Sequence, residues 1–269
     1  MRGNIFVSFH YVKYNELSNT SSVTVLINFV KWLTMKLPII FGHRGASAIE
    51  PENTMKAFIQ AFQDGADGIE FDVRLTADNQ MVIIHDSLIN RTSNGSGLVR
   101  KKTFQELLEF DFGKGEKIPL LEDVLKKYGN QKWLNIEIKE QGFEKQLLEM
   151  LENLKITQKY VISSFEISVL EKIKELNNEI PTAFLFEAGR INLSELIKKI
   201  DCKGIHPKHT IVNKSFMGEA LYYRLAVRAW TVDNPRKAWK LTKMRINGLI
   251  TNNPKKIINY LKGKIAKSL

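Results

Sequence analysis

The sequence predicts an α/β fold with a (β/α)8 barrel of the TIM type, and two observations support this. From residue 37 onward, short apolar segments alternate with amphipathic helical segments, a pattern typical of a mainly parallel sheet. Nine segments are strand candidates, and only residues 75–80 separate the second from the third, which is too short for a parallel crossover. These two strands therefore form a hairpin. Without the return strand of the hairpin, eight strands remain, which is the number that closes a (β/α)8 barrel of about 250 residues.

Each strand candidate is a short apolar run bounded by turn-forming or charged residues. In chain order they are Ile39–Phe41, Gly68–Arg74, Met81–His85, Trp133–Ile138, Tyr160–Ser163, Thr182–Phe186, Gly204–His206, Val227–Val232 and Gly248–Ile250. The hairpin turn centres near Asp78. Asn79 follows it, and asparagine tolerates the left-handed backbone conformation better than most residues, so we expect the turn to form.

One segment departs from strict alternation. Residues 87–117 are expected to form a small insertion beside the barrel mouth, with one helix near Thr103–Phe110. No linker or charge block divides the chain after Met35, so we expect one barrel domain over residues 35–269. Residues 1–34 form an N-terminal extension that we expect to lie outside the fold. Its apolar run, Val23–Leu33, is interrupted by charge and is shorter than the roughly 20 residues of a membrane-spanning helix.

The amino-acid composition restricts the class of protein but does not identify its binding partners. The 269 residues are 43% hydrophobic and 26% charged, which excludes disorder and a membrane-embedded bundle. A single cysteine, Cys202, excludes an intramolecular disulfide framework. The formal charge of +11 favours anionic partners in general, but it comes mainly from scattered lysines and is discounted as a functional signal. We expect a cytoplasmic protein with no nucleic-acid partner and no stable membrane insertion.

Charged residues occupy strand positions that should face the barrel interior. Glu70 and Asp72 are two residues apart and share one face of their strand, and Glu137 and Lys139 do the same on another strand. Burying ionised groups without partners costs several kcal/mol each, so three inward carboxylates and one lysine imply a metal, a phosphate or both. Oxygen ligands alone favour Mg²⁺ or Ca²⁺. A structural ion-pair network, or strands with their charges in solvent, is the alternative reading of this pattern.

Two histidines lie at strand ends, where barrel active sites are built. His43 and Arg44 follow the first strand, and His85 ends the return strand of the hairpin, close to Glu70 and Asp72 by cross-strand pairing. Two histidines beside a carboxylate cluster indicate an acid–base pair around a metal. The guanidinium of Arg44 suits phosphate oxygens, although it also has the geometry to pair with Glu52.

An ordered series of motifs resembles the glycerophosphodiester phosphodiesterase family. The first half of the series is His43-Arg44-Gly45, Pro51-Glu52-Asn53-Thr54, the segment 65–73, Thr76-Ala77-Asp78 and His85-Asp86. The second half is Arg91-Thr92-Ser93 with Gly97, the segment 118–122, Glu137-Ile138-Lys139, Ser163-Ser164-Phe165, Trp230-Thr231-Val232-Asp233 and the segment 248–252. Order and spacing match over about residues 37 to 262, which is far more specific than an isolated His-Arg-Gly.

The resemblance implies hydrolysis of glycerophosphodiesters, small-molecule substrates, to sn-glycerol 3-phosphate and an alcohol, with one divalent cation, Mg²⁺ or Ca²⁺. Carried over residue by residue, it assigns Glu70, Asp72 and Glu137 as metal ligands and His43 and His85 as the acid–base pair. It assigns Arg44 and Lys139 as phosphate contacts and Trp230 as a residue lining the substrate pocket. By the same resemblance, His43 is the base, and His85 the acid for the departing alcohol. The nucleophile is either water or the glycerol hydroxyl next to the phosphate.

Several other positions carry explicit expectations. His206 is expected to be structural, and Glu52 and Asn53 to order the first loop at the start of a helix. Asp86 is expected to point away from His85 and is left out of the catalytic set. Leu120 and Asn252 depart from the residues common in the family, and neither is expected to touch the chemistry. Two alternatives stay open: a related phosphodiesterase acting on lysophospholipids, and a non-catalytic phosphodiester-binding barrel.

Overall fold

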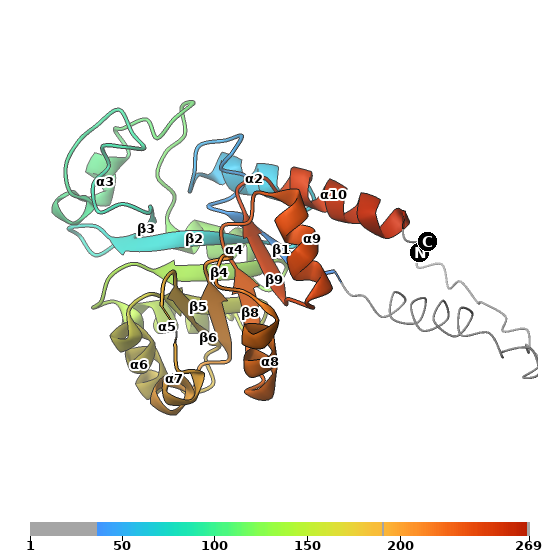
Figure 1. Cartoon of the computed structure of the whole chain (residues 1–269). Coiled ribbons are helices and arrows are strands. Elements are labelled where there is room, and N and C mark those ends of the chain that lie inside the picture. The colour runs from blue at the N-terminus through green and yellow to red at the C-terminus, as the bar shows by residue number, and fades with distance from the viewer. Residues whose placement is uncertain (1–36, 190, 268–269) are drawn as a thin grey trace, which may run out of the picture. The chain divides into compact units, whose positions relative to one another are not determined.

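Eight parallel strands close into a barrel in the computed structural model, which describes residues 37–189 and 191–267 (Figure 1). These eight and β3, an antiparallel hairpin strand beside β2, form a nine-stranded sheet among the described residues. The strands are β1 (Ile39–His43), β2 (Gly68–Leu75), β3 (Met81–Ile83), β4 (Trp133–Ile138), β5 (Tyr160–Ser164), β6 (Thr182–Phe186), β7 (Gly204–Pro207), β8 (Ala226–Ala229) and β9 (Gly248–Thr251). Their order is β1-β9-β8-β7-β6-β5-β4-β2-β3, and pairing of β1 with β2 closes the barrel. The predicted fold class is confirmed.

Helices follow the strands along the chain and, except for α3 in the insertion, cover the outside of the barrel (Figure 1). They are α2 (Met55–Gln63), α3 (Phe104–Leu107), α4 (Leu121–Tyr128), α5 (Glu144–Asn153), α6 (Ile167–Leu176), α7 (Leu193–Ile200), α8 (Lys214–Tyr222), α9 (Pro235–Lys243) and α10 (Pro254–Ala266), with a short 3-10 helix at Val99–Lys101. Among the described residues, no helix is both long and apolar enough to cross a membrane. The expected N-terminal extension, residues 1–34, lies outside the described residues.

The period-two alternation of β2 and β4 separates the apolar core from the charged interior. Ile69, Phe71 and Val73 of β2 are completely buried among apolar residues from the surrounding helices. The residues between them, Glu70 and Asp72, are equally buried but face the barrel interior. Successive side chains of a strand point to opposite faces, so one strand builds the core with one face and the site with the other.

The hairpin after β2 forms as predicted, but its return strand is shorter. Val73 pairs with Ile83 and Leu75 with Met81, in antiparallel register, and Asn79 has a left-handed φ of 58° in the turn. The predicted strand ended at His85, whereas β3 ends at Ile83. Beyond it, the His85 carbonyl accepts a hydrogen bond from the Arg74 guanidinium (2.8 Å) instead of a strand partner. The backbone therefore leaves the sheet before the histidine.

The predicted insertion packs against β3 through a small apolar cluster. Ile89, Val99, Leu107 and Phe112 of the insertion join Val82 of β3 and the flanking residues Ile84 and Ile118. Leu88 and Leu98 pair in an isolated antiparallel bridge, and helix α3 covers only Phe104–Leu107 of the longer range expected. The α3 N-terminus is a capping box, in which Thr103 and Glu106 satisfy each other's backbone N–H groups.

Candidate active site

Three buried carboxylates meet at the carboxyl ends of β2 and β4. The parallel register sets Asp72 opposite Glu137, and β1 sets His43 opposite Glu70. Glu70, Asp72 and Glu137 are 2%, 1% and 7% exposed, and one oxygen of each lies within 4.8 Å of the others. The structure thus brings together the three residues that were predicted to be metal ligands.

Two cations compensate this cluster only in part. Lys139 Nζ lies 2.6 Å from Glu137 Oε1 and 3.5 Å from Asp72 Oδ1, and Arg44 Nε lies 3.3 Å from Asp72 Oδ2. Burial, and then the charge of Asp72, raise the pKa of both Glu70 and Glu137 to about 8. Burial alone would raise the pKa of Asp72 as well, but Arg44 and Lys139 hold it below its usual value. More positive charge is therefore needed before all three groups ionise.

The donor set fits a hard divalent cation. Glu70 Oε1 and Asp72 Oδ1 are buried and accept no hydrogen bond among the described residues, which is costly for carboxylate oxygens; Asp72 Oδ1 has only the longer ion pair with Lys139, at 3.5 Å. The other oxygen of each is engaged: Glu70 Oε2 accepts from the Arg44 backbone N–H, and Asp72 Oδ2 accepts from Asn53 Nδ2. The backbone and Asn53 thus orient the carboxylates and leave one oxygen of each available to a cation.

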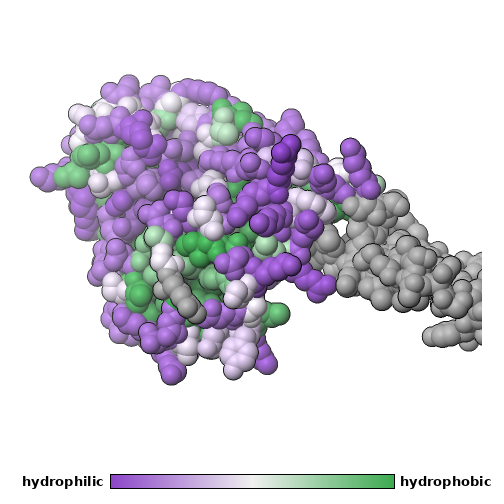
Figure 2. Space-filling model, viewed as in Figure 1, coloured by the Kyte–Doolittle hydropathy of each residue, from purple (hydrophilic) through white to green (hydrophobic). Residues whose placement is uncertain are grey.

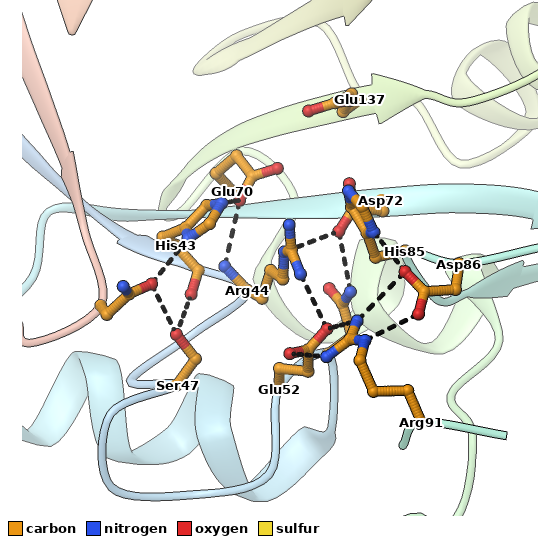
Figure 3. A network of polar contacts seen from close by, with 12 residues as sticks. His43, Arg44, Ser47, Glu52, Glu70, Asp72, His85, Asp86, Arg91 and Glu137 are labelled. Atoms are coloured by element: carbon orange, nitrogen blue, oxygen red, sulfur yellow. Dashed lines mark hydrogen bonds and ion pairs between the residues drawn. The ribbon is translucent and has the colours of Figure 1, made fainter. Parts of the chain in front are cut away.

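His43, at the end of β1, has one ring nitrogen held by the protein and the other directed toward the carboxylates. Its Nδ1 lies 2.6 Å from Asn252 Oδ1, and its Nε2 lies 3.9 Å from Glu70 Oε2 (Figure 3). Burial, and then Arg44, lower the pKa of His43. The loop that follows packs tightly on α2, since a Cβ on Gly45 would lie 2.6 Å from the Ala57 backbone. Asn252 was not expected to touch the proposed chemistry, but the structure places it in direct contact with a predicted site residue.

His85 also has an oxygen beside its Nδ1, but this oxygen belongs to a carboxylate. Its Nδ1 lies 2.6 Å from Asp86 Oδ1, whereas Asp86 was expected to point away. That expectation assumed that β3 continues through His85. Because the strand ends at Ile83, neighbouring side chains no longer alternate, and Asp86 turns toward the histidine. The pKa of His85 is lowered by burial, although Asp72 and Asp86 oppose this effect.

A chain of ion pairs connects Asp86 with Arg44. Arg91 donates to Asp86 Oδ2 (2.7 Å) and to both Glu52 oxygens (2.7 and 2.8 Å) (Figure 3). Glu52 Oε1 also accepts from Arg44 Nη1 at 2.8 Å. Glu52 therefore holds the phosphate-binding candidate in place as well as ordering its loop. The helix start expected from the same motif is confirmed, since Thr54 caps α2. Sequence reasoning did not identify the role of Arg91, although it lies in a motif quoted above.

These side chains surround a cavity of about 300 Å³. Its lining includes seven of the eight predicted site residues, namely His43, Arg44, Glu70, His85, Glu137, Lys139 and Trp230. Asp72, the eighth, is buried beside them. Phe165 and Trp230 form an edge-to-face pair with centroids 5.5 Å apart, and together with Leu185 and Ile250 they make part of the wall apolar. The face of the molecule drawn in Figure 2 is mainly hydrophilic, with smaller apolar areas. A larger hollow of about 520 Å³, between α5 and α6, contains none of the predicted site residues.

His206, for which a structural role was expected, lies deeper in the barrel and does not line the cavity. It is completely buried, with Nε2 3.3 Å from Arg228 Nη1 and Nδ1 3.5 Å from Asn135 Nδ2. Burial, followed by the charge of Arg228, lowers the pKa of His206 well below its usual value. Its backbone carbonyl accepts from Trp230 Nε1 (2.7 Å), which fixes the indole at the cavity wall.

Residues 43–256 match the model of the glycerophosphoryl diester phosphodiesterase family. The chain belongs to this family. A glycerophosphodiester phosphodiesterase of Caldanaerobacter subterraneus is 31% identical over 237 residues, which cover 83% of this chain and 98% of that protein. Another family member, from Bacillus altitudinis, is 33% identical over 235 residues, covering 81% and 96%.

Solved structures of family members share the barrel. An Oleispira antarctica phosphodiesterase in complex with the product sn-glycerol-3-phosphate is 29% identical, with a TM-score of 0.77, and the match covers 84% of this chain and 97% of that one. The glycerophosphodiester phosphodiesterase of Thermotoga maritima is 28% identical, with a TM-score of 0.72, and the match covers 83% and 98%.

Proposed function

We propose that this protein hydrolyses glycerophosphodiesters to sn-glycerol 3-phosphate and an alcohol, with one divalent cation and two histidines as acid and base. The observation that carries the proposal is the convergence of Glu70, Glu137, His43 and His85 on one cavity. Family membership supports the reaction, and the product complex of the Oleispira relative supports the substrate class.

Glu70, Asp72 and Glu137 are the residues that would hold the cation, Mg²⁺ or Ca²⁺. When bound, the cation supplies positive charge to phosphate oxygens, on which negative charge develops during cleavage. Arg44 and Lys139 line the same cavity and add donors for those oxygens. Their own carboxylate partners fix both side chains before substrate arrives, so little reorganisation is needed during the reaction.

The two histidines divide the proton transfers. His43 takes the proton from the nucleophile, which is water or the adjacent glycerol hydroxyl, and His85 gives a proton to the departing alkoxide. Each role is typically worth about 10² to 10⁴ in rate. In both residues the protein holds Nδ1, so Nε2 is the nitrogen available for proton transfer.

The test is release of glycerol 3-phosphate from glycerophosphocholine, glycerophosphoethanolamine and glycerophosphoglycerol, with and without a chelator. We expect activity that the chelator abolishes and that Mg²⁺ or Ca²⁺ restores. Release of a cyclic glycerol phosphate would identify the glycerol hydroxyl as the nucleophile. Faster turnover of lysophosphatidylcholine would favour the lysophospholipid alternative, and binding of glycerophosphocholine without turnover would favour the non-catalytic one.

The carboxylate cluster is tested by Glu70→Gln. We expect it to abolish metal-dependent turnover and the thermal stabilisation by Mg²⁺ or Ca²⁺, because the remaining carboxylates no longer compensate the cation. Glu144→Gln is the matched control, since Glu144 is also buried but accepts a hydrogen bond from Gly142 instead of joining the cluster. Full activity of Glu70→Gln, or of the wild type in excess chelator, contradicts the proposed metal site.

A further inference from the structure

A second layer of polar side chains lies behind His43. Asn252, directly after β9, places Oδ1 2.6 Å from His43 Nδ1 and Nδ2 2.6 Å from Asp233 Oδ2. Asp233, between β8 and α9, also accepts at Oδ1 from the Asn252 backbone N–H (2.8 Å) and from Thr251 Oγ1 (2.8 Å). Residues after two neighbouring strands thus hold one another and the histidine.

Asp233 decides which way the Asn252 amide points. A carboxylate only accepts hydrogen bonds, so the amide nitrogen must face Asp233 and the amide oxygen must face His43. Ser47 is compatible with this orientation but does not decide it, because its hydroxyl lies 2.9 Å from the same Oδ1 and 2.7 Å from the His43 carbonyl oxygen and has one proton to donate. In the opposite orientation the amide oxygen would face the Asp233 carboxylate, with no proton between them.

The amide orientation in turn selects the tautomer of His43. Because Asn252 Oδ1 is an acceptor, His43 must donate from Nδ1, and in the neutral ring Nε2 then carries the free lone pair. Nε2 is the nitrogen on the side of Glu70 and the cavity. The ring is thus preset to accept a proton where the substrate binds.

We propose that Asp233 and Asn252 are a positioning pair for His43, which fixes the base in its Nδ1–H tautomer. The inference deepens the proposed function, because it assumes that His43 acts as the base. Neither residue of the pair needs to touch the substrate. What the pair requires is one carboxylate and one amide, in complementary orientation.

The decisive experiment exchanges the two side chains. In Asp233→Asn the new amide must keep its oxygen toward Thr251 and turn its nitrogen toward Asn252, which then flips and presents Nδ2 to His43. We expect kcat with glycerophosphocholine to fall on the order of 10² to 10⁴, as for a base in the wrong tautomer, with KM within about threefold. Asn252→Asp sets two carboxylates against each other, and we expect a loss there as well.

The double variant Asp233→Asn/Asn252→Asp restores one carboxylate and one amide, with the carboxylate now facing His43. We expect kcat to recover to within about tenfold of the wild type, above both single variants. Asn253→Asp is the matched control. Like Asn252→Asp, it adds one negative charge, but one residue away, at the N-cap of α10, where aspartate caps as well as asparagine. A double variant no better than the worse single variant would overturn the proposal.

A second readout does not depend on turnover. Long-range proton–nitrogen spectra of the protein labelled with nitrogen-15 at its five histidines report the tautomer of each ring, and His43→Ala identifies the His43 signals. We expect Nδ1–H in the wild type and in the double variant, and Nε2–H in Asp233→Asn. A wild type with the Nδ1–H tautomer but no glycerophosphodiesterase activity would reject the proposed function and retain the pair, whereas Nε2–H in the wild type would reject the pair.

Discussion

The two histidines of the site have the same local geometry and different electrostatic surroundings. Each Nδ1 lies 2.6 Å from an oxygen, but the oxygen belongs to a neutral amide at His43 and to a carboxylate at His85. The His43 side chain is 17% exposed and that of His85 is 32% exposed. Burial lowers the pKa of both rings; Arg44 is the next largest influence at His43 and lowers its pKa further, whereas at His85 the next largest influences, Asp72 and Asp86, oppose the lowering.

The difference supports opposite roles for the two rings. A neutral amide favours the cation of the ring less than a carboxylate does, and the pKa of His43 is lowered despite its hydrogen bond to Asn252, so His43 is suited to begin as a neutral base. A carboxylate hydrogen bond stabilises the imidazolium, so His85 is the better residue to carry the proton for the leaving alkoxide. Arg91 keeps the Asp86 carboxylate charged and in place, because its hydrogen bonds hold the pKa of Asp86 well below the usual value.

Removing the base has the largest expected effect. His43→Ala should lower kcat on the order of 10² to 10⁴ with glycerophosphocholine and by a similar factor with a p-nitrophenyl phosphodiester. Both substrates need an activated nucleophile, whatever leaves. Steady-state kinetics with the two substrates test this, and a loss confined to glycerophosphocholine would reverse the assignment.

Removing the acid should depend on the leaving group. His85→Ala should lose on the order of 10² to 10⁴ in kcat with glycerophosphocholine, because a choline alkoxide needs a proton, and far less with a p-nitrophenyl phosphodiester, because p-nitrophenolate leaves without one. The measurement is the ratio of the two losses. Equal losses for the two substrates would show that His85 is not the acid.

Giving His85 the same kind of partner as His43 should have an intermediate effect on kcat. Asp86→Asn gives His85 an amide partner like that of His43 and removes one charge-assisted hydrogen bond, a difference of about 1 kcal/mol or roughly fivefold to tenfold in rate. We expect this loss with glycerophosphocholine and little change with the p-nitrophenyl substrate. A loss as large as that of His85→Ala would instead indicate that Asp86 determines where the ring lies.

The smallest effect concerns stability in acid. The pKa of Asp86 is lower in the folded state than the usual value of about 3.9, so its contribution to stability is present above about pH 5 and lost as the pH falls further. Asp86→Asn should therefore lower Tm slightly near pH 7, and the gap to the wild type should narrow toward pH 3. Thermal melts across this range test the sign, and a gap that widens in acid would contradict it.

The sequence predicted what depends on periodicity and missed what depends on where a strand stops. Alternation along β2 and β4 correctly placed Glu70, Asp72 and Glu137 on the inner face, because strand geometry alone sets that placement. Asp86 was misplaced because β3 ends two residues earlier than its apolar pattern suggests. The contact of Asn252 with His43 was missed because it joins the first and last strands of the barrel, 209 positions apart, and no local pattern reports such a contact.

The insertion is not separable from the barrel. Four of its apolar side chains pack against Val82 of β3 and the flanking Ile84 and Ile118, and Arg91 extends from it to both Asp86 and Glu52. A chimaera that replaces this segment with a relative's loop of equal length would keep a folded barrel but lose the hydrogen bonds from Arg91 to Asp86 and Glu52, which are the partners of His85 and Arg44. Loop grafting meant to change the preferred alcohol must therefore carry an arginine at this position, or it will alter the rate together with the specificity.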